Sequence, residues 1–336
     1  MSGSRTLEPA ACGQALDAER FRRDVLAGLA QPQKSLPCKY LYDEQGARLF
    51  EAICELPEYY PTRTETAILQ RHIAEIAALI GPGANLVDLG SGNGQKTRLL
   101  LEHLERPAAY CPVDVAREQL VECSARLAWE HPGLEVQPVC ADYTGPFELP
   151  PQPEGSGPTT VFFPGSTIGN FEPAQARVFL RRIAALSGPS GGLLVGVDLQ
   201  KAADVLNPAY NDSQGVTAQF NLNLLARVNR ELQARFDLAR FRHLAFYNEA
   251  AGRIEMHLVS RGPQRIPVDG STFSFARDET IVTEHSYKYT AGQFQQLAES
   301  AGFQVVRYWT DPRRWFSVHY LKPRPGARGD VPESCG

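Results

Sequence analysis

Residues 85–100 read NLVDLGSGNGQKTRLL, and this stretch decides the fold. The apolar run 85–89 predicts a buried strand, and residues 96–104 carry a helical pattern. Glycines separate them at every second position: Gly90, Gly92 and Gly94. Glycine lets the backbone adopt positive φ and approach a ligand closely, and the start of a helix presents free N–H groups. The stretch therefore predicts the binding site of a nucleotide-like cofactor.

The spacing of the glycines narrows the class of cofactor. A dinucleotide site has the pattern G-x-G-x-x-G, and Gln95 occupies the place of its third glycine. This chain instead has D-x-G-x-G-x-G, beginning at Asp88. That pattern resembles the first motif of the class I S-adenosylmethionine-dependent methyltransferases, which have no pyrophosphate to hold.

Two acids follow at the ends of later predicted strands. Asp114 lies 22 residues after Gly92, where an acid commonly accepts hydrogen bonds from ribose hydroxyls. Asp142 and Tyr143 end the third strand, where a carboxylate can accept from an adenine amino group and a ring can flank the base. An aspartate at a strand end is often only a turn former, but together with the glycines the two acids favour the cofactor.

Strands and helices alternate along most of the chain, which predicts a parallel, doubly wound Rossmann-like α/β sheet. The predicted strands are 85–89, 110–113, 136–140, 160–163, 193–199, 304–310 and 315–321. The predicted helices are 68–80, 96–104, 117–129, 173–186 and 291–301. Between the two series, the apolar stripe of Phe220, Leu224, Val228 and Leu232 precedes the strand-rich stretches 239–247, 253–260 and 280–289. We interpret this part as an inserted, smaller α+β domain.

Composition excludes several classes of protein. With 43% hydrophobic and 21% charged residues and a net charge of -4, the 336-residue chain resembles ordinary globular proteins, and we expect no nucleic-acid partner. It has no leader-like segment and no apolar run of membrane-spanning length, so we expect no membrane association. Seven scattered cysteines without a C-x-x-C pair indicate reduced thiols, and the seven histidines show no metal-ligand spacing. We expect a soluble, cytoplasmic protein without a metal.

Four further stretches resemble one family, the bacterial histidine Nα-methyltransferases of ergothioneine biosynthesis. They are KYLYDEQGARLFEAICELPEYYPTRTETAI (39–68), FPGSTIGN (163–170), YNDSQGVTAQF (210–220), and RIEMH (253–257) with TEHS (283–286). The resemblance extends from about residue 20 to residue 322, and these motifs are far more specific than the glycine turn.

The resemblance implies an enzyme that methylates the α-amino group of L-histidine three times, giving hercynine. S-adenosylmethionine would be the methyl donor and S-adenosylhomocysteine the second product. Residues 65–200 and 291–322 would form the methyltransferase domain, 20–64 and 201–290 the substrate-binding domain, and 323–336 a flexible tail. We expect a monomer.

The resemblance also assigns roles to individual residues. It implies contacts with the substrate carboxylate from Asn170 and Tyr210, with the amino group from the Gly165 backbone, and with the imidazole from Glu284 and Ser286. Tyr42 and Tyr59 would line the same pocket as catalytic residues, and Met256 would pack near the ring. The implied cofactor-binding residues are Gly90, Lys96, Asp114, Asp142 and Tyr143.

Each residue also has a purely structural interpretation. Glu284 would then be a solvated edge charge, Asn170 a turn asparagine, Lys96 an exposed side chain, and Tyr42, Tyr59 and Met256 core residues. At the level of function, the nearest alternative is a relative that methylates a tryptophan-derived or sulfur-bearing amine. A nucleic-acid amino-methyltransferase would need an N-P-P-Y-type motif where FFPGSTIGN stands. A non-enzymatic binding protein of this fold would more readily have lost Asp114 or the glycines.

Overall fold

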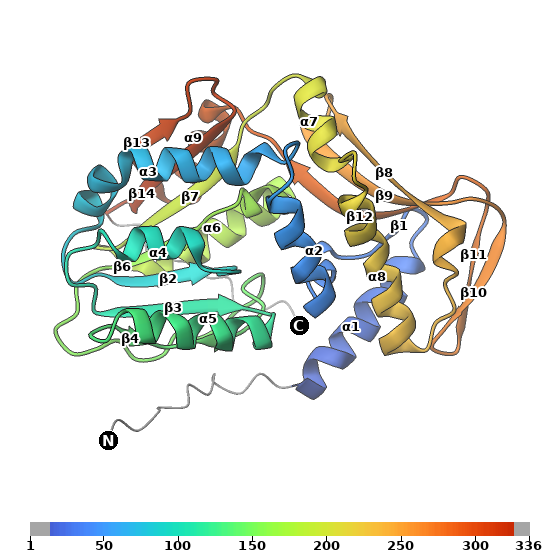
Figure 1. The fold of residues 1–336 in the computed structure, drawn as a ribbon, viewed down its shortest axis with the longest axis horizontal. Coiled ribbons are helices and arrows are strands. Elements are labelled where there is room, and N and C mark those ends of the chain that lie inside the picture. The colour runs from blue at the N-terminus through green and yellow to red at the C-terminus, as the bar shows by residue number, and fades with distance from the viewer. Residues whose placement is uncertain (1–13, 326–336) are drawn as a thin grey trace. The chain divides into compact units, whose positions relative to one another are not determined.

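The computed structural model describes residues 14–325 (Figure 1). Within this range the chain divides into two compact units. Unit 1 comprises residues 64–199 and 289–325, and unit 2 comprises residues 14–63 and 200–288. Of the predicted tail 323–336, the part from residue 326 onward lies outside the described residues, and Pro323 is the last residue of a strand.

Unit 1 is built on a sheet that has eight strands in the described range, in the order β13-β14-β7-β6-β2-β3-β4 with β5 beside β3. The strands are β2 (Asn85–Leu89), β3 (Ala109–Asp114), β4 (Glu135–Val136), β5 (Val139–Cys140), β6 (Thr159–Phe163), β7 (Gly192–Asp198), β13 (Phe303–Thr310) and β14 (Phe316–Pro323). From β2 the chain proceeds outward to β3 and then returns to β6 on the other side of β2. The strand order therefore reverses beside β2, which is where ligands bind in open sheets of this kind.

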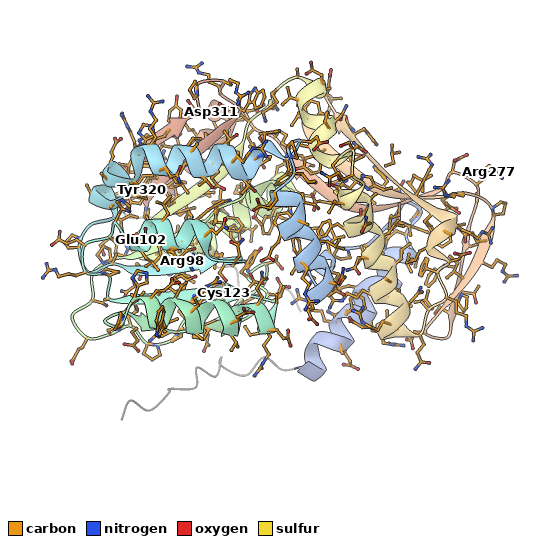
Figure 2. All side chains as sticks on the ribbon, in the orientation of Figure 1. Arg98, Glu102, Cys123, Arg277, Asp311 and Tyr320 are labelled. Carbon is orange, nitrogen blue, oxygen red and sulfur yellow. The ribbon has the colours of Figure 1, made fainter. Side chains whose placement is uncertain are left out.

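Helices cover both faces of this sheet (Figure 1). On one face are α3 (Tyr60–Ile80), α4 (Gln95–Leu101) and α5 (Arg117–Glu130), and on the other are α6 (Pro173–Ser187) and α9 (Ala291–Ser300). α3 buries the apolar stripe Ile68, Leu69, Ile73, Ile76 and Ile80 in the core cluster that also contains Phe162 and Tyr320. The labelled Arg98 and Glu102 lie on and just after α4, and Cys123 lies on α5 (Figure 2). The predicted doubly wound Rossmann-like fold is confirmed.

Three details of unit 1 differ from the prediction. β14 is antiparallel to both β7 and β13, because a short turn joins β13 to β14 and leaves no room for a crossover. The predicted strand 136–140 is split into β4 and β5 around Pro138, which cannot donate a backbone hydrogen bond. α3 begins at Tyr60 instead of residue 68, with Pro61 accommodated in its first turn.

Unit 2 contains a sheet of order β1-β12-β9-β8 and a separate hairpin, β10-β11. Its strands are β1 (Lys34–Ser35), β8 (Phe241–Asn248), β9 (Arg253–Ser260), β10 (Gln264–Val268), β11 (Ser271–Phe275) and β12 (Thr280–Tyr287). Its helices are α1 (Gln14–Leu29), α2 (Glu44–Cys54), α7 (Ala203–Tyr210) and α8 (Val216–Leu232), with the short 3-10 turns η1 (Cys38–Leu41) and η3 (Leu238–Arg240). The predicted stripe is confirmed, because Phe220, Leu224, Val228 and Leu232 are all buried in α8.

Sequence patterns did not predict the β10-β11 hairpin or α7. Asp269 and Gly270 form the hairpin turn, with φ of 44° and 77°. The dipeptide Asp-Gly is a sequence signal for a two-residue hairpin turn, but Pro267 in the preceding segment argues against a strand there. The labelled Arg277 lies in the next turn, between β11 and β12 (Figure 2). α7 contains Pro208, which argues against a helix in the sequence. Among residues 14–325, no helix combines the length and apolarity needed to cross a membrane.

Candidate active site

The loop after β2 takes its shape from glycines with a left-handed backbone. The φ angles of Gly90, Gly92 and Gly94 are 75°, 49° and 72°. The Gly90 N–H donates to the Val113 carbonyl at 2.8 Å, and Gly94 is the N-cap of α4. Because a side chain in this conformation costs about 1–2 kcal/mol per residue, glycine is the residue that the loop requires.

The same loop has features of a site for a polar cofactor. A Cβ atom added at Gly92 would meet nothing within 4 Å, so the backbone there faces open space. Ser91 Oγ is buried and has no hydrogen-bond partner in the described part of the chain. Since buried hydroxyls are normally paired, an unpaired one beside an open backbone fits a ligand that supplies the missing partner.

Asp114, at the end of β3, lies beside this loop. Its Oδ2 accepts from the Gly92 N–H at 3.3 Å and its Oδ1 from the Ala116 N–H at 3.0 Å. Burial raises the pKa of Asp114, and the backbone donors of Ala116 and Gly92 oppose that rise. The backbone thus fixes this carboxylate next to the second glycine.

Asp142 and Tyr143 follow β5, the neighbour of β3. Asp142 Oδ1 accepts from the Thr144 N–H at 2.9 Å. The Tyr143 ring packs edge-on against Phe163 with the centroids 5.7 Å apart, and its hydroxyl lies 3.4 Å from where a Cβ of Gly90 would be. The structure therefore brings Gly90, Asp114 and Tyr143 together around the glycine loop, as expected of cofactor-binding residues.

Lys96 is not simply exposed, because it forms an ion pair with the carboxylate of Glu65 on α3. Glu65 is 1% exposed, and both of its oxygens also accept from the Gly165 N–H, at 2.9 and 3.1 Å. A Cβ added at Gly196 of β7 would overlap Glu65 Oε1, so glycine at that position makes room for the carboxylate. Glu65 thereby links α4, β7 and the loop after β6.

The loop between β6 and η2 (Thr167–Asn170) is held by several hydrogen bonds. Gly165 and Ser166 have φ of 79° and 59°, and Ser166 Oγ accepts from the Asp198 N–H at 2.8 Å. Because the Gly165 N–H is committed to Glu65, this residue can offer a ligand only its carbonyl. Asn170 is partly exposed, and its side chain makes no hydrogen bond within residues 14–325.

Asp88 connects neighbouring elements of unit 1 through one of its two carboxylate oxygens. It is fully buried and accepts hydrogen bonds from the hydroxyls of Thr97 and Tyr110. Burial raises its pKa to about 7, and these two donors oppose the rise. The acid that opens the glycine motif therefore ties β2 to β3 and α4.

In unit 2, five aromatic side chains form an aromatic cluster: Tyr42, Phe50, Tyr59, Tyr210 and Phe220. The ring centroids of neighbouring members lie 5.4 to 6.4 Å apart. Burial raises the pKa of Tyr59 well above its usual value of 10, so its phenol stays protonated at neutral pH. The cluster offers ring faces and phenol donors to a ligand.

A polar strip lies on one face of β12. Glu284 and Ser286 alternate along the strand and so share a face, with 8% and 3% of their surfaces exposed. Met256 of β9 pairs directly with Glu284 in the sheet register and is 1% exposed. Burial raises the pKa of Glu284 to about 7, and the charge of Lys288 opposes this rise. Burial, and to a smaller extent the charge of Glu284, raises the pKa of the Cys38 thiol to about 12. A carboxyl, a hydroxyl and a thioether are therefore available for recognising a polar ring.

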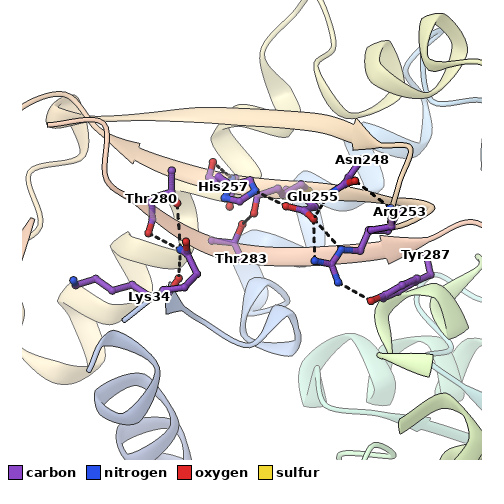
Figure 3. A network of polar contacts seen from close by, with 12 residues as sticks. Lys34, Asn248, Arg253, Glu255, His257, Thr280, Thr283 and Tyr287 are labelled. Atoms are coloured by element: carbon purple, nitrogen blue, oxygen red, sulfur yellow. Dashed lines mark hydrogen bonds and ion pairs between the residues drawn. The ribbon is translucent and has the colours of Figure 1, made fainter. Parts of the chain in front are cut away.

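The charged residues of the RIEMH stretch serve the opposite face of this sheet (Figure 3). Glu255 accepts from Arg253 Nε at 2.9 Å and from Asn248 Nδ2 at 3.0 Å, and it lies 3.2 Å from His257 Nε2. Arg253 also donates to the Tyr287 hydroxyl at 2.6 Å. Of this motif, Ile254 and Met256, which pair with Ser286 and Glu284, share the face of the polar strip.

The structure separates the predicted site residues into two groups. Unit 1 contains Gly90, Lys96, Asp114, Asp142, Tyr143, Gly165 and Asn170, and unit 2 contains Tyr42, Tyr59, Tyr210, Met256, Glu284 and Ser286. Within the described residues no group of three or more histidine, cysteine or acidic side chains is arranged to hold a metal ion.

Sequence reasoning missed Glu65, Phe50 and Lys288. Glu65 ends the distinctive LPEYYPTRTE stretch and Lys288 follows the TEHS stretch by two residues, so motif position was a signal for both. Phe50 also lies in a family stretch, 39–68, but an aromatic residue in a helical pattern normally indicates core packing.

Comparison with known proteins agrees with these features. The family described as "Histidine-specific methyltransferase, SAM-dependent" matches residues 21–323. The chain is 43% identical over 306 residues to the histidine N-alpha-methyltransferase of Mycolicibacterium smegmatis, covering 90% of this chain and 94% of that protein. It is 42% identical over 296 residues to the enzyme of the same name from Mycobacterium tuberculosis, covering 87% and 91%.

A fungal relative is also similar over most of this chain. The ergothioneine biosynthesis protein 1 of Neurospora crassa is 32% identical over 285 residues, which are 82% of this chain and 32% of that longer protein. The family match covers nearly the whole described range, and the glycine loop and its carboxylates fit the cofactor. The chain therefore belongs to the histidine-specific, S-adenosylmethionine-dependent methyltransferases.

Proposed function

We propose that this enzyme methylates the α-amino group of L-histidine three times to form hercynine, a step of ergothioneine biosynthesis. The names of the bacterial and fungal relatives support the substrate and the pathway. The single observation that carries the proposal is the buried polar strip of Glu284 and Ser286 in the same unit as the aromatic cluster. A free amino acid with a polar ring matches that combination.

Unit 1 supplies the proposed cofactor site. The backbone of Gly90 would contact the cofactor, Asp114 would accept from the ribose hydroxyls, and Asp142 would accept from the adenine amino group. Tyr143 would flank the base, and Lys96, oriented by Glu65, would offer its remaining N–H donors to an anionic group. The bound cofactor supplies an electrophilic methyl group whose leaving group is a neutral thioether, so the protein need not protonate a leaving group.

The proposed substrate contacts are residues of the family motifs. Glu284 and Ser286 would hold the imidazole, with Met256 packed against the ring. Asn170 would donate to the carboxylate, and Tyr210, whose proton is donated to Ser286, would pack against it. A site that hydrogen-bonds both ends of the substrate discriminates against apolar amino acids, because buried polar groups would then be left unpaired.

The attacking amine must lose a proton, since its reference pKa of about 8 leaves only a minority neutral at pH 7. The Gly165 carbonyl would accept from an N–H of the amine and aim its lone pair at the methyl group. Tyr59, protonated at neutral pH, would act as a donor and a ring surface, and Tyr42 would offer a route for the released proton. Ring faces also stabilise the growing cation, by about 0.5–2 kcal/mol.

Mass spectrometry tests the reaction. Incubation of histidine with S-adenosylmethionine and the enzyme should give a ladder of one, two and three added methyl groups. Tryptophan incubated in parallel should remain unchanged. Methylation of tryptophan in preference to histidine would contradict the proposal.

The further proposals are that the enzyme is a monomer in the cytoplasm and that the two units divide cofactor and substrate binding. Sedimentation velocity measures whether the enzyme is a monomer, and fractionation of cells from the native host measures whether it lies in the cytoplasm. The affinities of variants of one unit for both ligands test whether the units divide cofactor and substrate binding.

A further inference from the structure

A buried lysine beside the polar strip has no role in the mechanism above. Lys288 follows β12, is 2% exposed, and has its Nζ 2.8 Å from both Ser286 Oγ and the Tyr210 hydroxyl. The two hydroxyls lie 3.1 Å apart, with Tyr210 donating to Ser286. All three side chains belong to unit 2 and form a closed triangle of hydrogen bonds.

The number of donors and acceptors in this triangle restricts what Ser286 can do. An ammonium group has donors only, so both hydroxyl oxygens accept from Lys288. Ser286 Oγ accepts a second hydrogen bond from Tyr210, and this occupies both of its acceptor positions. The hydroxyl proton of Ser286 is then what it can offer to a ligand.

We propose that Lys288 is a specificity-determining positioning residue, which makes Ser286 a hydrogen-bond donor and thereby selects the neutral imidazole of histidine over the imidazolium. The unprotonated ring nitrogen would accept from Ser286, and the N–H on the other side would donate to Glu284. The inference rests on the proposed assignment of Ser286 and Glu284 to the imidazole.

The ionisable groups around the strip are consistent with this selection. Cys38 of η1 and Tyr59 before α3 have pKa values raised by burial, so they are neutral at pH 7. Tyr210 of α7 is held by Lys288, and the backbone carbonyl of Tyr210 lies 2.8 Å from His243 Nε2 of β8. Glu284 and Lys288 are the other ionisable groups of the strip, and an uncharged ring hydrogen-bonded to Glu284 and Ser286 would complete a run of hydrogen bonds from the Glu284 carboxyl to the Lys288 ammonium.

The opposite arrangement of the hydroxyl protons makes the opposite prediction. If Ser286 donated to Tyr210, it would keep an acceptor position and could receive an N–H from an imidazolium ring. Histidine would then bind more tightly, relative to an uncharged analogue, as the pH fell. The two arrangements therefore predict opposite pH dependences for one ratio, the Kd of histidine divided by the Kd of an uncharged analogue.

Calorimetry on the enzyme saturated with S-adenosylhomocysteine measures that ratio. Histidine is compared with 1,2,4-triazolylalanine, whose ring has the same donor and acceptor but is protonated only in much stronger acid. Titration of Glu284 or of the α-amine changes the Kd of both ligands by the same factor, so these two effects cancel in the ratio of the Kd values. For the wild type, Kd of histidine over Kd of the triazole should rise about tenfold from pH 7.5 to 5.5, because an imidazole of pKa near 6.5 becomes protonated.

Lys288→Met should reduce that rise to less than about threefold, because Ser286 regains an acceptor position. The matched control is Lys201→Met, since Lys201 also donates to a tyrosine hydroxyl, that of Tyr60 at 2.7 Å, but does not contact Ser286. It should keep the wild-type ratio. Affinity for S-adenosylhomocysteine, a property of unit 1, should be unchanged in both variants and reports correct folding.

Two results would overturn the inference: a Lys288→Met ratio with the wild-type pH dependence, or a wild-type ratio that falls as the pH falls. The wild-type measurement decides the matter alone if Lys288→Met does not fold. Failure of the underlying assignment is distinguishable, because histidine affinity would then be the same in Ser286→Ala as in the wild type.

Discussion

The glycine loop of unit 1 and the polar strip of unit 2 are two candidate binding surfaces that are constructed differently. In the loop, the backbone determines the site, through left-handed glycines and through N–H groups that fix the Asp114 carboxylate. In the strip, recognition depends on a few side chains, above all Glu284 and Ser286, and on the buried lysine behind them. A site made of backbone tolerates few changes, whereas a site made of side chains can change its ligand by single substitutions.

The largest effect expected from this contrast concerns pH and the carboxyl of Glu284. Because burial raises its pKa from 4.5 to about 7, the folded protein keeps a proton there that the unfolded chain releases. This group therefore costs stability as the pH rises from 4.5 to 7, by roughly 2 to 4 kcal/mol. Glutamine cannot ionise, so Glu284→Gln does not lose stability in this way. The free energy of unfolding of the variant minus that of the wild type should therefore increase by this amount between pH 4.5 and 7.5, as measured by urea denaturation.

Glu255→Gln on the other face of the sheet is the control. The pKa of Glu255 is lowered, since its hydrogen bonds with Arg253 and Asn248 outweigh its desolvation, so its carboxylate stabilises the fold above its unfolded pKa. Its glutamine variant should therefore keep a nearly constant stability relative to the wild type between pH 4.5 and 7.5, and the difference should shrink only as the pH falls below 4.5. An equal rise in both variants between pH 4.5 and 7.5 would contradict the account of Glu284.

Glu284→Ala tests whether the strip recognises the substrate. Loss of a hydrogen bond to a charged group costs about 1.5–3 kcal/mol, so kcat/KM for histidine should fall about 10- to 100-fold while the affinity for S-adenosylhomocysteine stays constant. Selectivity against other amino acids should relax. Steady-state kinetics with Glu255→Ala as the matched variant give the comparison, and an unchanged kcat/KM in Glu284→Ala would remove this residue from the site.

Asp114→Asn tests the complementary property of unit 1. The amide loses the charge that strengthens hydrogen bonds from ribose hydroxyls, so the Kd of S-adenosylhomocysteine should rise about tenfold. Asp311→Asn is the control, because Asp311 is also buried and accepts backbone N–H groups, from Arg313, Trp315 and Phe316, in a turn remote in sequence from the glycine loop. Calorimetry should show weakened cofactor binding in Asp114→Asn only.

The smallest effect is expected at Gly90. Alanine there must adopt φ of 75° with its Cβ 3.4 Å from the Tyr143 hydroxyl, which should lower stability by about 1 kcal/mol and raise the Kd of the cofactor a few-fold. Gly133→Ala meets no atom within 4 Å and is not in a left-handed conformation, so it should have neither effect. Thermal unfolding and calorimetry of the pair measure the difference, and equal results would mean that the loop tolerates a side chain.

The contrast between the two sites also explains what the sequence could predict. The glycine loop, its strand and its helix are contiguous, so their spacing predicts a site for a nucleotide-like cofactor, and the resemblance to a methyltransferase motif indicates which cofactor. The polar strip lies on β12 alone, but Met256 of β9 and Tyr210 of α7 contact it from elsewhere in the chain, and Glu284 and Tyr210 are predicted through family motifs and not through any local pattern. Asp88 belongs to the motif but is fully buried, and its Oδ2 accepts from the hydroxyls of Thr97 and Tyr110, contacts that the motif does not reveal.

Other features depend on contacts that no local pattern records. The role of Glu65 is visible only when α3, α4, β7 and the loop after β6 are placed in three dimensions. The antiparallel β14 follows from the length of its connection to β13, which a strand pattern does not reveal by itself. The triangle around Lys288 required the register of β12 and the end of α7.

The bare position at Gly196 has a consequence for how this enzyme can diverge or be redesigned. A side chain at 196 would occupy the same volume as the carboxylate of Glu65, so none can be added there while the glutamate remains. A larger residue at 196 would have to arise together with a shorter one at 65, and Lys96 would then need a new counterion. Engineering of this loop should therefore treat the two sites as a single inherited unit, altered jointly or left alone.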